Sequence, residues 1–127
     1  MATMEILSEE LVKEAIVGAL EGGSNYWYFL PDTSRLAVRH KVPQSENEYL
    51  SEAVGEAVYK GANVMFRDAE DTNEVLGTLS KESIDSGLYR MVSEGRTELE
   101  DIRSGNADAE TYDVMFQYFV LGEIVFG

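Results

Sequence analysis

The chain has no cysteine, one histidine and two prolines among its 127 residues. Without cysteine it can have no disulfide, no thiolate nucleophile and no cysteine-based zinc or iron–sulfur site. A single imidazole excludes histidine-rich metal sites and any mechanism that needs two imidazoles. A run of acidic residues from Asp68 is similar to a calcium loop, but Asn73 replaces the glycine of its sixth position and Leu79 the glutamate of its twelfth. We therefore expect no metal and no cofactor.

Positive charge is also scarce. Lys and Arg number 10 against 24 Asp and Glu, so the formal net charge is -14. Direct nucleic-acid binding is not expected, because neutralising phosphates requires a cationic surface. A dense acidic surface can instead imitate a nucleic-acid backbone and occupy the cationic groove of a partner protein. The alternative is that the acidic residues serve solubility alone.

Long apolar runs are missing as well. The longest uncharged stretches, residues 22–31 and 114–122, are shorter than the roughly 18 apolar residues that a membrane-spanning helix needs. The N-terminal residues have neither a basic region nor a long apolar region, as a secretory signal would. We expect no membrane association and a cytoplasmic location, which would be the host cell cytoplasm if the chain is encoded by a phage.

The remaining pattern predicts one compact domain over residues 1–127, because single domains commonly have this length. Apolar spacing with serine or aspartate starts and glycine stops predicts helices at residues 8–21, 45–60, 80–93 and 108–121, with a short one at 97–104. Residues 62–68 and 74–79 read as a hairpin, and the aromatic segment 25–30 as a strand with a return strand at 36–38. The fold class is α+β, with about four helices and one or two small hairpins around a single core.

One basic island follows the aromatic segment. Aromatic faces beside guanidinium groups are the usual components for stacking a base and holding a phosphate. The candidate ligand-binding residues are Tyr26, Trp27, Arg35, Arg39 and His40. The alternative is a solvated loop whose cations offset neighbouring carboxylates. No nucleophile or orienting carboxylate accompanies His40 in sequence, so no catalytic residue is predicted.

Rows of carboxylates form the other candidate surface. Glu48, Glu52 and Glu56 recur at the spacing of one helical face, where like charges repel by a few tenths of a kcal/mol per pair. A helix that tolerates this repulsion is selected for a charged surface or for solubility. The candidate partner-binding residues are Glu48, Glu52, Glu56, Glu98, Glu100 and Asp101.

Two motifs lie far apart in the chain: residues 21–27 read EGGSNYW, and residues 108–127 contain DAxxxDxxxQ followed by GEIVFG. Together they resemble the N-terminal EGGxxYW and closing DAxxxDxxxQ and GE[IV]V[FY]G signatures of small uncharacterised bacteriophage and prophage proteins. Leu121 stands where that family often has phenylalanine. The resemblance implies a viral or mobile-element origin, and it carries over no reaction and no catalytic residue.

The motif residues also suggest their own packing. Asp113 and Gln117 lie one helical turn apart and share a face. Gln117 lies among apolar residues, so we expect it to be partly buried and to bond the backbone of the aromatic segment. Residues 124–126 are expected to pack near Tyr26 and Trp27, which would join the two ends of the chain in one core.

The expected function is that of a phage-type accessory protein that acts by binding and not by catalysis. Its sharpest form is an acidic inhibitor or modulator of a host protein with a cationic surface, such as a nucleic-acid-binding or antiviral-defence factor. One alternative is a small-ligand binder that sequesters a nucleotide-like anion. Another is a virion structural or assembly protein, for which homo-oligomer formation would be the first sign.

Overall fold

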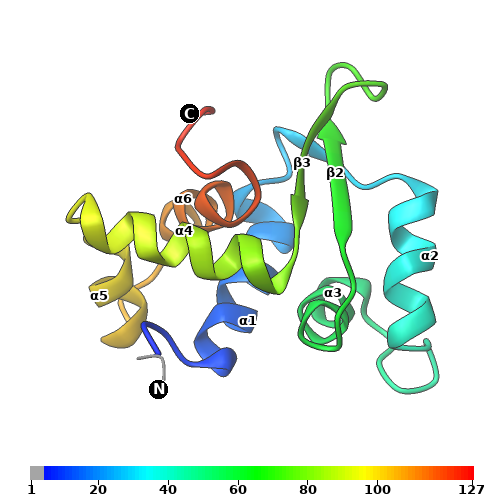
Figure 1. The fold of residues 1–127 in the computed structure, drawn as a ribbon, viewed down its shortest axis with the longest axis horizontal. Coiled ribbons are helices and arrows are strands. Elements are labelled where there is room, and N and C mark those ends of the chain that lie inside the picture. The colour runs from blue at the N-terminus through cyan, green and yellow to red at the C-terminus, as the bar shows by residue number, and fades with distance from the viewer. Residues whose placement is uncertain (1–4) are drawn as a thin grey trace.

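The structure, a computed structural model, describes residues 5–127. Helices and a small antiparallel sheet share one hydrophobic core, which confirms the α+β class (Figure 1). The elements in chain order are α1 (Glu9–Gly18), the π-helical turn η1 (Ala19–Gly23), β1 (Tyr28–Phe29), α2 (Asp32–Lys41), α3 (Leu50–Tyr59), β2 (Val64–Asp68), β3 (Val75–Leu79), α4 (Lys81–Ser93), α5 (Glu98–Arg103) and α6 (Ala109–Leu121). Within residues 5–127, no helix has the length and apolar character needed to cross a membrane.

Three helices begin at polar caps where the sequence predicts them. Ser8 accepts a hydrogen bond from the Leu11 amide and starts α1. Ser80 and Asp108 form reciprocal capping boxes at the starts of α4 and α6. Each cap satisfies amides that the first turn of a helix leaves without a partner, so these boundaries are set locally.

The sheet has the order β1-β2-β3, with antiparallel pairs throughout. β2 and β3 form the predicted hairpin, pairing Val64 with Leu79 at its base. Only two residues of the aromatic segment 25–30 are in strand conformation, and they pair with Arg67 and Asp68 at the end of β2. The aromatic segment is therefore mainly a connection that enters the core.

The predicted return strand at residues 36–38 is wrong, because these residues lie in helix α2. Asp32 occupies the first turn of this helix, and Arg39, His40 and Lys41 its last turn. Charges in this order complement the helix dipole, so the basic island marks a helix C-terminus. The buried Ser34 hydroxyl donates to the Met65 carbonyl at 2.6 Å and holds α2 against β2.

Helix α6 is the central element. It packs against α1, α4, α5, β3 and η1, and Figure 1 shows it behind α4. Its residues from Met115 to Val120 are all buried. A helix that is enclosed on most sides buries residues all round instead of presenting one apolar stripe.

Helices α4 and α6 approach closely at Gly87. A Cβ atom at this position would lie 2.5 Å from the Tyr118 carbonyl oxygen. In an exposed helix interior, Gly→Ala stabilises by up to about 1 kcal/mol. Here Gly87→Ala should instead lower the free energy of unfolding by about 1–3 kcal/mol, because the helices must separate.

Urea unfolding measures this effect. Ser86→Ala is the matched control, since Ser86 is the exposed neighbour on the same helix, and it should change stability by less than about 0.5 kcal/mol. A Gly87→Ala protein as stable as the wild type would contradict the close packing of α4 on α6.

Candidate functional site

A buried carboxylate joins the two motifs. Asp113 of α6 accepts hydrogen bonds from the Ser24 hydroxyl at 2.7 Å, the Tyr26 hydroxyl at 2.6 Å and the Trp27 indole nitrogen at 2.8 Å. Ser24, Trp27 and Asp113 are all buried. Three donors on one carboxylate compensate for its removal from water, so the pairing fixes residues 24–27 against α6.

Gln117 lies one turn further along α6 and holds the chain after that helix. Its side-chain oxygen accepts from the amides of Val125 and Phe126, and its side-chain nitrogen donates to the Phe126 carbonyl. Its burial is as predicted, but its expected partner is wrong, because it bonds the tail and not the aromatic segment. Both segments lie near α6, but the backbone bonds of Gln117 go to Val125 and Phe126.

The tail also meets the aromatic segment, as expected. The Phe126 ring stacks on Trp27 with centroids 5.3 Å apart and an angle of 7° between the planes. Trp27 further contacts Phe116 and Tyr28. Such aromatic pairs add about 0.5–1.5 kcal/mol beyond the area they bury. The two motifs therefore form one structural unit.

Gly23 allows the EGG turn to pack closely against the start of α6. It ends η1, and a Cβ atom there would lie 2.6 Å from the Ala109 carbonyl oxygen at the start of α6. Any larger residue would push the EGG turn away from Asp113. The glycine pair therefore ends a helix, as predicted, and also allows close contact between two distant segments.

A cleft of about 750 Å³ runs between these segments, which we call the motif cleft. Its lining includes Tyr26, Arg96, Asp113 and Gln117. Asp113 and Gln117 make the bonds described above, and Arg96 makes two hydrogen bonds to Glu98. The other carboxylate of the lining, Glu110, is exposed in the first turn of α6, and His40 is not part of the lining. This arrangement favours a structural role.

The structure does not bring the five candidate ligand residues together. Tyr26 lines the motif cleft, Trp27 is only 2% exposed, and His40 is exposed at the end of α2. Arg39 donates to the backbone carbonyls of residues 42, 47 and 48, so it supports the loop before α3. Arg35 lines a different cleft from Tyr26, so the set is divided between two clefts.

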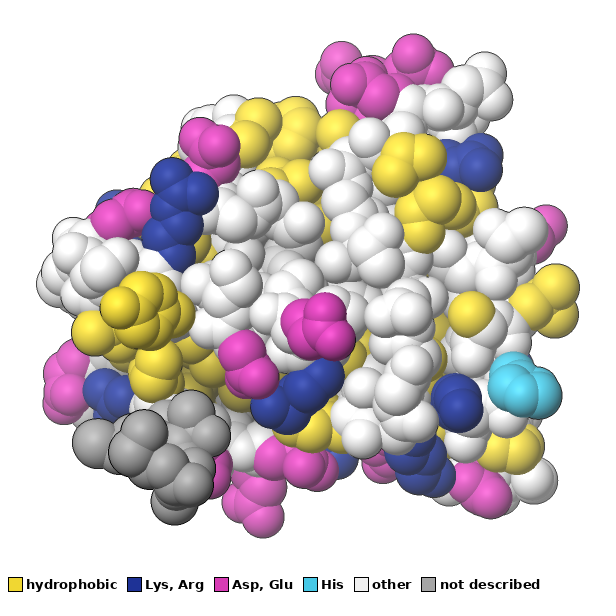
Figure 2. Space-filling view, in the orientation of Figure 1, with side chains coloured by type: hydrophobic (Ala, Val, Ile, Leu, Met, Phe, Trp, Pro, Cys, Tyr) yellow, Lys and Arg dark blue, Asp and Glu magenta, His cyan; other side chains and the backbone are white. Residues whose placement is uncertain are grey.

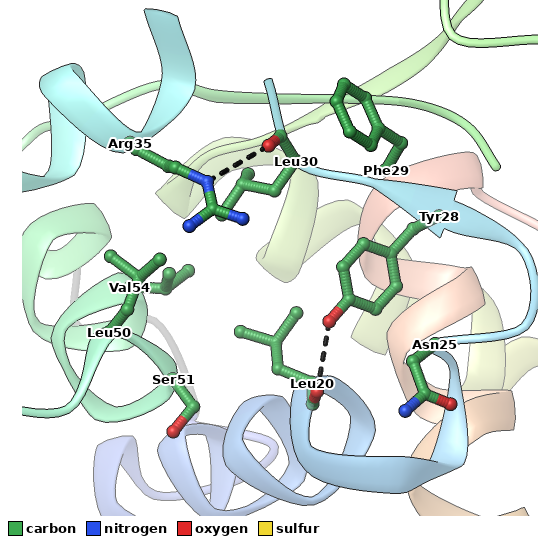
Figure 3. Close-up of a pocket in the computed structure, with 9 residues that line it drawn as sticks. All are labelled: Leu20, Asn25, Tyr28, Phe29, Leu30, Arg35, Leu50, Ser51 and Val54. Carbon is green, nitrogen blue, oxygen red and sulfur yellow. Dashed lines mark hydrogen bonds between the residues drawn. The ribbon is translucent and has the colours of Figure 1, made fainter. Parts of the chain in front are cut away.

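This second cleft, which we call the Arg35 cleft, has a volume of about 350 Å³ and is shown in Figure 3. It lies among η1, β1, α2 and α3, and sequence reasoning missed most of it. Its lining residues are Leu20, Asn25, Tyr28, Phe29, Leu30, Arg35, Leu50, Ser51 and Val54. The Arg35 Nε donates to the Leu30 carbonyl at 3.2 Å, and the Tyr28 hydroxyl donates to the Leu20 carbonyl at 2.9 Å.

The six candidate acidic residues have different surroundings. Glu48, Glu52 and Glu100 are exposed, whereas Glu56 and Asp101 are half-buried. Glu98 is paired with Arg96 and its side chain is only 12% exposed. The predicted three-residue row on one helix is wrong, because α3 begins at Leu50 and Glu48 precedes it.

No protein-family model matches the chain, and no curated protein or solved structure is significantly similar to it. Among residues 5–127, no three His, Asp or Glu side chains come together in a way that could hold a metal ion.

Replacing Asp113 tests the unit that joins the motifs. Asp113→Asn should lower the free energy of unfolding by about 2–4 kcal/mol, because a neutral amide cannot accept from all three donors and leaves buried groups unpaired. Glu110→Gln is the control, since it removes the same charge from an exposed position on α6. Equal losses in the two variants, measured by urea unfolding, would contradict this role of Asp113.

The Tyr26 hydroxyl makes the stability of this structural unit depend on pH in the alkaline range. Burial of the phenol, and then its hydrogen bond to Asp113, raise the pKa of Tyr26 to about 12. Because this pKa lies above that of the unfolded chain, the stabilisation is complete below about pH 10 and is lost as the pH rises towards about pH 12. The stability difference between the wild type and Tyr26→Phe should therefore shrink over this range.

Unfolding by urea at about pH 8 and about pH 11.5 measures the difference. The pKa of Tyr59 is also raised to about 12, but Tyr59 is present in both proteins and its effect cancels. A stability difference between the wild type and Tyr26→Phe that stays constant with pH would show that Tyr26 is not held by Asp113.

Proposed function

We propose that the chain is a phage-type accessory protein that acts by binding, and that its acidic surface engages a host protein with a cationic face. The observation that carries this proposal is the division between the two kinds of charge. Most cations are engaged in contacts within the chain, whereas most carboxylates are exposed and have no cation paired with them.

Among residues 5–127, five cations form ion pairs with carboxylates: Lys13, Lys60, Lys81, Arg90 and Arg96. Four more donate to backbone carbonyls: Arg35, Arg39, Arg67 and Arg103. These pairs occupy five carboxylates, against 24 Asp and Glu in the chain. Solubility alone does not require cations to be used in this way, so the charge pattern favours a cationic partner.

Two groups of exposed carboxylates lie at the β2–β3 hairpin tip and around the start of α3. Glu70, Asp71 and Glu74 lie at the tip of the β2–β3 hairpin, which projects from the body, and Figure 2 shows acidic side chains there. Around the start of α3, Glu48 and Glu52 are exposed, and Glu21 joins this region by accepting a hydrogen bond from Ser51.

The start of α3 suits a docking surface better than the hairpin tip. Arg39 fixes the segment before this helix through the carbonyls of residues 47 and 48, so the carboxylates stand on an ordered backbone. Fixed charges attract an oppositely charged partner before contact and accelerate association, and salt weakens the effect. We therefore place the partner contact at Glu21, Glu48 and Glu52, which we call the α3 acidic edge.

Reversing charge on this edge should weaken partner capture. The double variant Glu48→Lys with Glu52→Lys should bind the captured host protein about tenfold more weakly and with a smaller salt dependence. The measurement is affinity capture from bacterial lysate at low and high salt, with quantification by mass spectrometry.

The control makes the same change in net charge elsewhere. Glu10→Lys with Glu123→Lys also combines one first-turn residue with one residue outside a helix, and both are exposed. This control should retain capture within about twofold, since its charges act only at long range. Capture that is insensitive to salt, or is equal in both variants, would rule out the α3 acidic edge.

A further inference from the structure

We propose that the Arg35 cleft binds a mononucleotide, with the phosphate at Arg35 and the base between Tyr28 and helix α3. This site adjoins the α3 acidic edge, because its lining residue Ser51 donates to Glu21, and it differs from the ligand site expected from sequence. It rests on the charge of the cleft, the shape of its walls and the polar groups at its far end.

The cleft has unusual electrostatics for this protein. Its lining contains one charged residue, Arg35, and no Asp or Glu, although the chain has 24 carboxylates. The bond from Nε to Leu30 fixes the guanidinium group, and its two terminal nitrogens have no hydrogen-bond partner among residues 5–127. Figure 3 shows these nitrogens directed into the cleft. A fixed guanidinium with free terminal donors matches the geometry of a phosphate or carboxylate.

The walls suit a flat ring. The Tyr28 side chain is held by its hydrogen bond to the Leu20 carbonyl and by an edge-to-face contact with Phe66, whose ring centroid lies 5.5 Å from that of Tyr28. Leu50 and Val54 of α3 lie across the cleft from it (Figure 3). An aromatic face opposite aliphatic side chains is a usual setting for a base, because every base has a π-face that can stack.

The end away from Arg35 offers polar groups. The Asn25 side chain lies there and makes no hydrogen bond within the described residues, and Ser51 donates to Glu21 at 2.7 Å. Glu21 disfavours a second anion at this end and favours a donor, such as the amino group of adenine or cytosine. At about 350 Å³ the cleft lies at the small end of ligand sites, which span about 300–1,000 Å³, and holds one nucleotide.

The overall negative charge does not prevent this binding. Charges further away than about 8–10 Å are largely screened at physiological salt, so the residues that line the cleft dominate. We therefore expect affinity to rise with salt at low ionic strength, opposite to the behaviour predicted for the α3 acidic edge.

Calorimetry with adenosine 5′-monophosphate tests the proposal on the full chain. This probe should bind at least about tenfold more tightly than inorganic phosphate or adenosine alone, because both ends of the cleft contribute. Benzoate is a further comparison ligand in the same experiment. Tighter binding of benzoate than of the nucleotide would overturn the mononucleotide assignment. Absence of nucleotide binding at millimolar concentrations would overturn it too.

Variants locate the site. Arg35→Gln should weaken nucleotide binding by about tenfold or more. Arg35→Lys should weaken it by less, because lysine keeps the charge but lacks the paired donors of the guanidinium group. Lys41→Gln is the matched control, because it removes the same charge from an exposed position on α2 outside the cleft. Equal effects of Arg35→Gln and Lys41→Gln would overturn the site.

A second variant separates binding from folding. Asn25→Ala changes an exposed side chain at the far end of the cleft. It should weaken binding of adenosine 5′-monophosphate about fivefold and leave any binding of inorganic phosphate unchanged. Unchanged nucleotide affinity in this variant would contradict the orientation proposed here.

Discussion

One buried carboxylate determines how the aromatic segment meets helix α6. Asp113 accepts three hydrogen bonds from residues 24–27, and the burial of its charge is tolerable only while those donors remain in place. The contact places Trp27 in the core, where Phe126 can stack on it, and Gln117 then holds the tail that carries Phe126. The motif residues therefore act as a connected set, with α6 as the common support.

Local features of the fold were predictable from sequence, and their tertiary partners were less so. Caps at Ser8, Ser80 and Asp108 and the β2–β3 hairpin follow from short-range rules. The helix at α2 was missed, although Asp32 at its start and a basic C-terminal turn are helix signals. The preceding aromatic residues have a high strand preference and so favour a hairpin there. The partner of Gln117 could not be predicted, since several backbone segments approach α6.

The candidate site shows a similar limit. The sequence predicted a ligand site from aromatic and basic residues that are close in the chain. In the structure, Trp27 is buried in the core and Arg39 supports a loop. The Arg35 cleft instead combines residues from η1, β1, α2 and α3, whose apolar members read as ordinary core positions in sequence. A free guanidinium beside a cleft without carboxylates can be recognised only when the elements are placed in space.

The long separation between the partners of Asp113 has a consequence for biosynthesis. Ser24 and Asp113 lie 89 residues apart in the chain, so the ribosome must add this length of chain after Ser24 before Asp113 can leave the exit tunnel. Until then Trp27 has neither its acceptor nor its stacking partner, and the nascent chain keeps apolar surface open to water. The core therefore cannot close before α6 is available to pack against it.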